Sequence, residues 1–389
     1  MTVASRELTI PRLDGSLERY SPGQPQAFTR PVEPLSSRIL YAAVHVVADP
    51  LASDTERAVL DWQATMEYRR HLWSWGLGVA EAMDTAQRGM GLDYRATREL
   101  IARTAAEAKT VGGALVCGAS TDQLPPDERF GLSEITSAYI EQCRYIEEQG
   151  AGIVLMASRH LAAAAGGPED YRRVYDEVLS ELERPVIIHW LGEMFDPALA
   201  GYWGSAELDR AMELCLGLLH DHRDRIDGVK LSLLDKDREV QLRSMLPDGV
   251  RMYTGDDFNY DELILGDGDR HSDALLGIFD GIAPAASAAV QALDDGRVEE
   301  YREILAPTVP LARHIFSTPT YYYKTGMVFL SYLNGHQSHF RMVGGLESAR
   351  SVPHLSELFI LADRAGLLAD PELAVARMRA FLELAGVDA

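Results

Sequence analysis

The chain has 389 residues, 47% of them hydrophobic and 25% charged, which is enough for one large α/β domain with an appended region. Its formal net charge of −22 and pI of about 4.9 argue against nucleic-acid binding, which depends on clustered lysine and arginine. No apolar stretch approaches the roughly 20 residues that cross a bilayer, and the first residues lack the apolar core of a signal peptide. We therefore expect a cytoplasmic protein with no membrane partner.

Short apolar runs begin after a proline-rich opening, which we assign to an N-terminal extension of residues 1–37. Each run has the length and continuous apolarity of a buried strand. The runs span residues 38–47, 76–82, 112–119, 151–158, 185–192, 226–232, 249–257 and 272–279.

The stretches between these runs carry apolar residues at the three- and four-residue spacing of helices. Residues 54–75 and 133–150 are examples, and the second ends at Gly150, a residue type that favours helix ends. The region 197–224 is interpreted as an inserted loop followed by a helix. Eight strands, each followed by a helix, predict an α/β fold, a (βα)8 TIM barrel over residues 38–284. A doubly wound sheet is the alternative, but no glycine-rich phosphate turn follows the first strand.

The strand pattern stops near Pro284, so residues 285–389 are predicted to form a helical C-terminal region. Four helices are expected, beginning near Ala285, Val298, Tyr322 and Pro353. The third is rich in aromatic side chains, which are enriched in the cores of protein interfaces. These residues, Tyr321, Tyr322, Tyr323, Phe329 and Tyr332, favour a homo-oligomer, either a dimer or a tetramer. The alternative is a helix packed on its own barrel.

One lysine stands in an apolar strand. Lys230 lies between Val229 and Leu231, where a buried ammonium is costly unless it is paired, deprotonated or chemically used. Desolvation lowers the pKa of a lysine, and the free amine can condense with a carbonyl group to form a Schiff base. The alternative is a lysine that bridges an acidic residue across the barrel.

Other polar residues follow the predicted strands, at the end of the barrel where TIM-barrel chemistry lies. His189 is the second catalytic candidate. The candidates for substrate binding are Glu81, Asp84, Arg159, His160, Ser232, Asp256 and Asp257.

Three stretches resemble the dihydrodipicolinate synthase and N-acetylneuraminate lyase family of class I aldolases. They are "IDGVKLS" at 226–232, "MYTGDD" at 252–257 and "ALLGIFDGIAP" at 274–284. The sequence is most similar to a longer branch that is filed as a domain of unknown function. The resemblance implies that Lys230 is the imine-forming lysine.

The chain departs from this family at two places near the expected site. The family binds the carboxylate of pyruvate with Gly-Thr-Thr-Gly-Glu, but this chain has "AEAMD" at 80–84. The family's tyrosine on strand five aligns with His189, and its tyrosine pair after strand four is replaced by Arg159 and His160. A histidine can relay protons near neutral pH with a pKa better matched than that of tyrosine. Its alternative role is structural, with the ring bonded to a backbone carbonyl.

The aligned position of Glu81 bears on the substrate. A carboxylate there would repel a 2-oxo acid in a partly desolvated pocket. A polyhydroxylated, sugar-like ketone or aldehyde is therefore expected rather than pyruvate.

The leading hypothesis is a Schiff-base lyase or aldolase that needs no cofactor or metal and acts on a small-molecule carbonyl substrate. The second is a metal-dependent isomerase, epimerase or hydrolase with Glu81, His160, His189 and Asp256 as ligands of one divalent ion. The third is a non-catalytic ligand-binding relative on the same fold.

Overall fold

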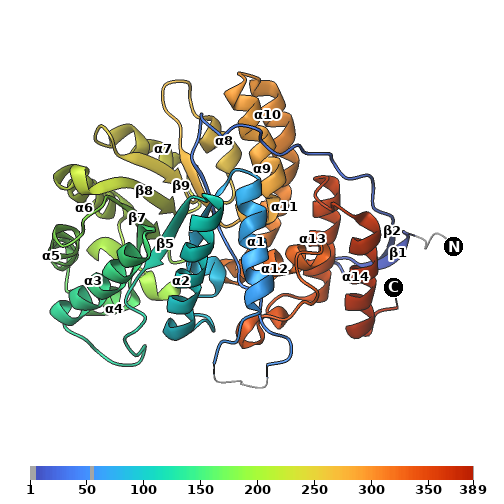
Figure 1. Cartoon of the computed structure of the whole chain (residues 1–389), viewed down its shortest axis with the longest axis horizontal. Helices are drawn as coiled ribbons and strands as arrows, with labels where there is room; N and C mark the ends of the chain where they lie inside the picture. Colours follow the sequence, from blue (N-terminus) through green and yellow to red (C-terminus); the bar gives the residue numbers. More distant parts are fainter. Residues whose placement is uncertain (1–5, 53–56, 389) are drawn as a thin grey trace.

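The computed structural model describes residues 6–52 and 57–388. Residues 1–5 of the predicted extension, 54–56 of the first predicted helix and Ala389 lie outside the described residues. A barrel surrounded by helices occupies one side of the molecule, and the last helices of the chain lie beside it (Figure 1). Within the described ranges, no helix is long and apolar enough to cross a membrane.

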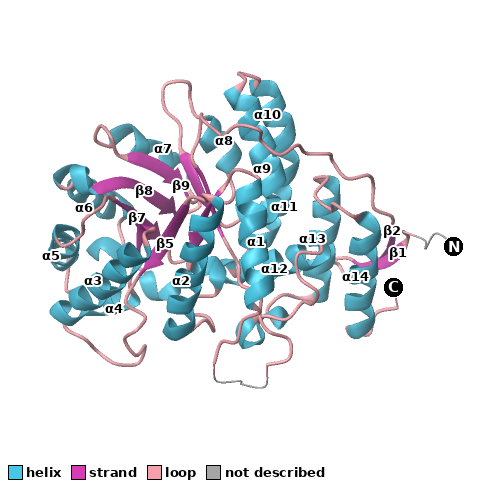
Figure 2. Ribbon diagram, in the orientation of Figure 1, coloured by secondary structure: helices cyan, strands magenta, loops and turns pink. Residues whose placement is uncertain are grey.

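Eight parallel strands close into a barrel, in which each strand pairs with the next along the chain and the last pairs with the first (Figure 2). The strands are β3 (Leu40–Ala43), β4 (Gly78–Glu81), β5 (Leu115–Ala119), β6 (Gly152–Met156), β7 (Val186–Leu191), β8 (Ile226–Ser232), β9 (Arg251–Thr254) and β10 (Asp273–Leu276). Each predicted apolar run contains one of them. The prediction of a TIM barrel is confirmed.

A helix follows each strand of the barrel. These helices are α1 (Trp62–Ser74), α2 (Tyr94–Val111), α3 (Leu132–Gln149), α4 (Arg159–Ala164), α5 (Pro168–Ser180), α6 (Leu208–Asp221), α7 (Lys236–Met245), α8 (Tyr260–Leu265) and α9 (Phe279–Asp294). Helix α3 ends at Gly150 in the left-handed conformation, with φ of 82°, which a residue with a side chain rarely adopts. The segment before α6 forms two short 3-10 turns, as the interpretation of an inserted loop expects.

The C-terminal region is helical, as expected. It contains α10 (Val298–Leu305), α11 (Val309–Ile315), α12 (Tyr323–Leu333), α13 (Val352–Arg364) and α14 (Pro371–Leu384). Helices α11 and α14 were not predicted from the sequence. Helix α9 also spans the predicted boundary at residue 284.

The aromatic run of α12 packs on its own chain. Tyr323 and Phe329 are buried, and Phe329 contacts the rings of Phe340 and Phe381 at centroid distances of 4.8 and 5.0 Å. The prediction that these rings form an exposed interface is therefore wrong for Tyr323 and Phe329. The homo-oligomer stays a prediction from sequence, without this support.

The N-terminal extension contains a hairpin that the sequence analysis did not predict. It consists of β1 (Leu8–Pro11) and β2 (Leu17–Tyr20), and it lies against α13. The hydroxyl of Tyr20 donates to Asp363 at 2.6 Å, and the N–H of Gln26 donates to the carbonyl of Gly366 at 3.0 Å. The two ends of the chain are therefore joined side by side (Figure 1).

The barrel interior contains a cluster of buried apolar side chains. This layer consists of Ala43, Ala80, Met83, Val116, Val154, Met156, Ile187, Tyr253 and Leu275. A filled interior leaves the C-terminal ends of the strands as the place for polar chemistry.

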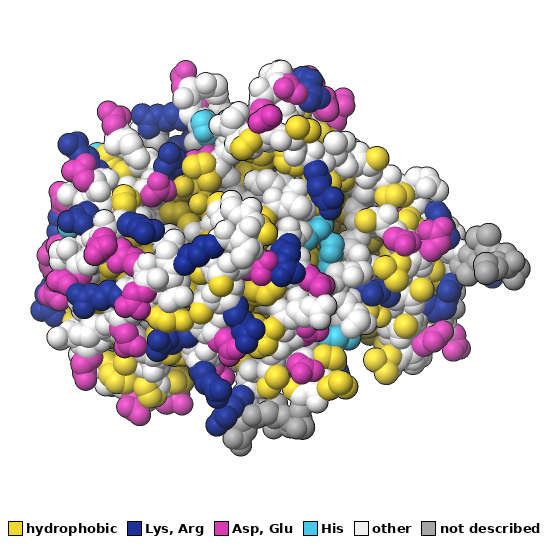
Figure 3. All heavy atoms as spheres, in the orientation of Figure 1, with side chains coloured by type: hydrophobic (Ala, Val, Ile, Leu, Met, Phe, Trp, Pro, Cys, Tyr) yellow, Lys and Arg dark blue, Asp and Glu magenta, His cyan; other side chains and the backbone are white. Residues whose placement is uncertain are grey.

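Charged side chains of both signs are intermixed on the face shown in Figure 3. This distribution lacks the basic patch that a nucleic-acid-binding face would show there.

Candidate active site

Lys230 points into the barrel, as predicted. In the parallel register it lies level with His189 on β7 and Tyr253 on β9. Tyr253 belongs to the interior layer, whereas Val229 and Leu231 pack on the outer side against the helices. Lys230 is only 7% exposed.

A small cavity of about 10 Å³ surrounds the Lys230 side chain, which is room for about one water molecule. Its polar lining comes from strand ends and from one helix outside the barrel. The lining residues are Ala43, Met83, Asp84, Thr85, His189, Leu191, Phe195, Lys230, Ser232, Asp257, Gly277 and Tyr323. Of the predicted site residues, the structure thus brings together Lys230, His189, Asp84, Ser232 and Asp257.

Lys230 and Asp257 titrate together. Burial lowers the pKa of Lys230 to about 8, although the carboxylates of Asp257 and Asp84 hold it up. Burial raises the pKa of Asp257 to about 7. Two groups oppose this rise: the backbone N–H of Ile278, which donates to Oδ1 at 2.7 Å, and the positive charge of Lys230. The charge of each group therefore affects the protonation of the other near neutral pH, although no hydrogen bond or ion pair joins them in the described structure.

Gly255 allows Lys230 and its neighbours to pack closely. A Cβ atom there would lie 2.9 Å from Cε of Lys230 and 2.8 Å from the carbonyl oxygen of Leu231. Both distances are too short for real contacts, so the glycine of "MYTGDD" is needed for the lysine's position.

His189 is buried and neutral. Its Nε2 lies 3.2 Å from Oγ of Ser232, and its Nδ1 has no hydrogen-bond partner among the described residues. Burial, together with the charge of Lys230, lowers the pKa of His189 well below its usual value. The expectation of a histidine with a near-neutral pKa is therefore wrong, although Nδ1 remains a free acceptor.

Thr85 and Tyr323 were missed. The hydroxyls of Thr85 and Tyr323 are hydrogen-bonded at 2.7 Å, and both residues line the cavity of Lys230. The Tyr323 ring stacks on Phe316 at 4.3 Å, and burial raises the pKa of Tyr323 well above its usual value. The "YYYK" run at 321–324 marks Tyr323 as a polar aromatic candidate. Nothing in the sequence shows, however, that α12 reaches the mouth of the barrel.

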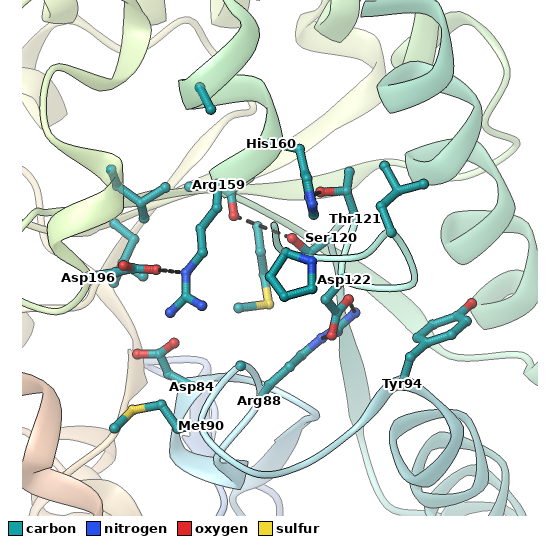
Figure 4. Close-up of a pocket in the computed structure, with 18 of the residues that line it drawn as sticks. Asp84, Arg88, Met90, Tyr94, Ser120, Thr121, Asp122, Arg159, His160 and Asp196 are labelled. Carbon is teal, nitrogen blue, oxygen red and sulfur yellow. Dashed lines mark hydrogen bonds and ion pairs between the residues drawn. The ribbon is translucent and has the colours of Figure 1, made fainter. Parts of the chain in front are cut away.

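A larger pocket of about 590 Å³ adjoins this cavity. Asp84, Leu191 and Phe195 line both. Besides Asp84, the predicted residues Arg159 and His160 line the larger pocket (Figure 4).

His160 is held on both ring nitrogens. Its Nε2 faces the carbonyl oxygen of Pro125 at 3.2 Å, and its Nδ1 faces Oγ1 of Thr121 at 2.9 Å. Thr121 is bonded in turn to Ser158, at 2.6 Å. Nε2 is therefore the protonated nitrogen, and Nδ1 accepts from Thr121.

Glu81 does not contact either cavity. Its carboxylate forms a two-point ion pair with Arg69 of α1, with N–O distances of 2.8 and 3.0 Å, and accepts from Thr104 of α2 at 2.7 Å. Both charged side chains are fully buried. Ala80 occupies the inward position on β4, so Glu81 must point to the helices. The prediction that Glu81 binds substrate is wrong.

Asp256 stabilises a turn. Its carboxylate accepts from the N–H groups of Phe258 and Asn259 at 2.8 and 3.1 Å, and from the Asn259 side chain at 2.9 Å. It lines neither cavity. The prediction that Asp256 binds substrate is wrong as well.

The four side chains of the metal hypothesis do not converge. Glu81 faces α1 and α2, Asp256 bonds within its own turn, and His160 is bonded at the rim of the larger pocket. Only His189 lines the Lys230 cavity. Among the residues that the structure describes, no three His, Cys, Asp or Glu side chains are placed to hold a metal ion.

The fold is similar to that of solved structures from the dihydrodipicolinate synthase family. The chain is 13% identical to YagE, a prophage protein of the dihydrodipicolinic acid synthase family from E. coli K12 in complex with pyruvate; the TM-score is 0.66 over 85% of this chain and 99% of that one. It is 15% identical to the 4-hydroxy-tetrahydrodipicolinate synthase of Methylacidiphilum fumariolicum SolV, with a TM-score of 0.62 over 89% and 98%. For the dihydrodipicolinate synthase of Aquifex aeolicus the identity is 15% and the TM-score 0.62, over 85% and 99%. The predicted likeness is thus confirmed at the level of the fold.

The sequence comparison gives a family without a named activity. The profile of the family described as "Protein of unknown function (DUF993)" matches residues 8–387. No curated protein matches the chain.

Proposed function

The chain belongs to the DUF993 family, and we propose that it is a class I aldolase-type lyase in which Lys230 forms a Schiff base with a small carbonyl substrate. The observation that carries this proposal is the buried Lys230 amine, which lies at the catalytic end of a TIM barrel beside Asp257 and has a lowered pKa. The shared fold with dihydrodipicolinate synthases supports it.

Asp257 can accept and return the proton that is transferred while Lys230 forms the imine. Asp257 can take a proton from the ammonium through a water molecule in the shared cavity, and the free amine adds to the carbonyl carbon. The carbinolamine hydroxyl then leaves as water after Asp257 returns the proton. The protonated imine accepts the electron pair of a neighbouring C–C or C–H bond when that bond breaks.

Three other groups can hold the substrate during this reaction. In the Thr85–Tyr323 pair one hydroxyl donates to the other, so one O–H remains to donate to a substrate oxygen, because burial keeps the tyrosine protonated. The unpartnered Nδ1 of His189 can accept a hydrogen bond from a substrate hydroxyl.

Asp84 takes over the role that was predicted for Glu81. It lines the Lys230 cavity, and its charge acts on Lys230. A carboxylate next to the substrate carbonyl would meet both Asp84 and Asp257, so pyruvate is disfavoured by Coulomb repulsion. A carbonyl compound with hydroxyl groups beside the carbonyl fits better, because Asp84 can accept from them.

Borohydride trapping tests the proposal. Protein is reduced with borohydride in the presence of hydroxyacetone, dihydroxyacetone or pyruvate, and its intact mass and modified peptide are measured. We expect an adduct on Lys230 with the hydroxylated ketones and none in Lys230→Met. The control Lys236→Met removes an exposed lysine of α7 and keeps the adduct.

Two results would contradict the proposal. An adduct that survives in Lys230→Met, or no adduct with any carbonyl compound, rules out the imine at Lys230. Stronger trapping of pyruvate than of the hydroxylated ketones rules out the substrate preference.

A further inference from the structure

Most polar groups on the wall of the larger pocket are already bonded to the protein. Arg88 donates to Asp122, to Gln142 and to two backbone carbonyls, and it is buried. His160 and Thr121 are bonded to each other. These groups have little capacity left for a ligand.

Lys324 is different. It lines the pocket, is only 1% exposed, and within the described part of the chain its ammonium donates only to the carbonyl oxygen of Tyr321, at 3.0 Å. The nitrogen also lies 4.7 Å from the centre of the Tyr323 ring. An ammonium has three donors, so two remain without an acceptor there. A buried charge with so few partners favours a ligand that supplies an acceptor.

Arg159 provides a second cation on the same pocket. Its Nε donates to Asp196, but its two terminal nitrogens make no hydrogen bond to the residues that the structure places. The guanidinium lies over Gly89, where a Cβ atom would come within 3.3 Å of it. Its terminal N–H groups form a fork that suits a carboxylate. In Figure 4 the guanidinium lies with Asp84 and Asp196 on one side of the pocket.

The rest of the pocket wall is largely apolar. Its apolar residues include Leu92, Leu124, Pro126, Phe130 and Leu199. A volume of about 590 Å³ accommodates a ligand well beyond the size of a three-carbon acid.

We propose that this pocket binds a carboxylate that carries an aryl or alkyl group, with the carboxylate at Lys324 and Arg159 and the apolar group against Phe130 and the leucines. A singly charged anion fits better than a phosphate dianion, because the carboxylates of Asp84 and Asp196 act on Lys324 as well. This inference rests on the proposed function. The substrate would then carry its carboxylate at some distance from its carbonyl group, and the carbonyl group would pass Asp84 to reach Lys230.

Binding of carbonyl-free probes tests the pocket separately from the chemistry at Lys230. We would measure 3-phenylpropanoate and 3-phenylpropanol by isothermal titration calorimetry. The acid should bind the wild type about ten-fold more tightly than the alcohol, as expected for hydrogen bonds to charged groups. This preference should disappear in Lys324→Met, weaken in Arg159→Gln and persist in the surface control Lys236→Met.

Each other outcome contradicts the proposal: equal affinities for acid and alcohol, a preference that survives both variants, tighter binding of phenyl phosphate, or no binding at millimolar concentration. If Lys324→Met does not fold, Arg159→Gln decides, since the Arg159 side chain is 47% exposed. Because neither probe forms an imine, a failure here leaves the trapping result unaffected.

Discussion

Neighbouring residues at the strand ends differ in role because a strand turns alternate side chains to opposite faces. On β4, Ala80 faces the barrel interior and Glu81 faces α1 and α2. After β9, Asp257 reaches the Lys230 cavity while Asp256 bonds within its turn. A shift of one residue thus separates a group that can take part in chemistry from one that stabilises the fold.

The Glu81 ion pair predicts a loss of stability. Glu81→Thr leaves the buried guanidinium of Arg69 without its counter-charge, and breaking such a pair costs roughly 3–5 kcal/mol. Urea unfolding should show this loss, and the combined variant Arg69→Met with Glu81→Met should recover part of it. Pyruvate trapping should not improve in Glu81→Thr. An improvement would show that the carboxylate faces the substrate.

The rate of imine formation should depend on pH through Lys230. Its pKa is lowered to about 8, so the reactive free amine increases as pH rises through 8. The trapping rate should therefore rise between pH 6 and 9, with a midpoint about 2.5 pH units below the ordinary lysine pKa of 10.5.

Asp257→Asn separates the two effects of the carboxylate on this profile. Removing the charge that holds the proton on Lys230 should move the midpoint to lower pH, while loss of the proton acceptor should lower the maximum rate. A midpoint that does not move would show that Asp257 does not act on the amine.

At the scale of elements, two segments outside the strands close the catalytic end. Helix α12 supplies Tyr323 to the Lys230 cavity and Lys324 to the larger pocket, as consecutive residues. The segment between β7 and α6 supplies Phe195, whose ring lies edge-on to Tyr323 at 6.1 Å and to Phe316 at 6.3 Å. Both cavities share Phe195, so it stands between the larger pocket and the lysine.

Phe195 should limit access to Lys230. Phe195→Ala removes the ring that both cavities share, and it should speed the trapping of bulky ketones without moving the pH midpoint. The matched control is Leu199→Ala, because Leu199 is buried and lines only the larger pocket. Single-turnover trapping with a small and a bulky ketone measures the effect. Equal acceleration in both variants would point to general loosening.

For the whole molecule, the barrel was predictable because each strand is a continuous apolar run. That same continuity hides which residues face inward, since a strand buried on both faces shows no alternation. The inward orientation of Lys230 was inferred from its place in an apolar strand and is confirmed, but Glu81, chosen from the end of its strand and from the alignment, faces the helices instead.

Contacts between distant segments could not be predicted. The Tyr323–Thr85 bond joins residues far apart in sequence, and the N-terminal hairpin packs on a helix at the other end of the chain. Its strands have only four residues each, which is too short for a clear pattern in the sequence.

The late position of α12 in the chain has a consequence for synthesis. Tyr323 and Lys324 leave the ribosome about 90 residues after Lys230, a delay of roughly 5–20 s at ordinary elongation rates. During that interval the growing chain already contains its amine nucleophile but not the helix that encloses it. The N-terminal hairpin is made first, yet it waits for α13 to emerge before it can dock. The site of Lys230 is therefore enclosed only when translation is nearly complete.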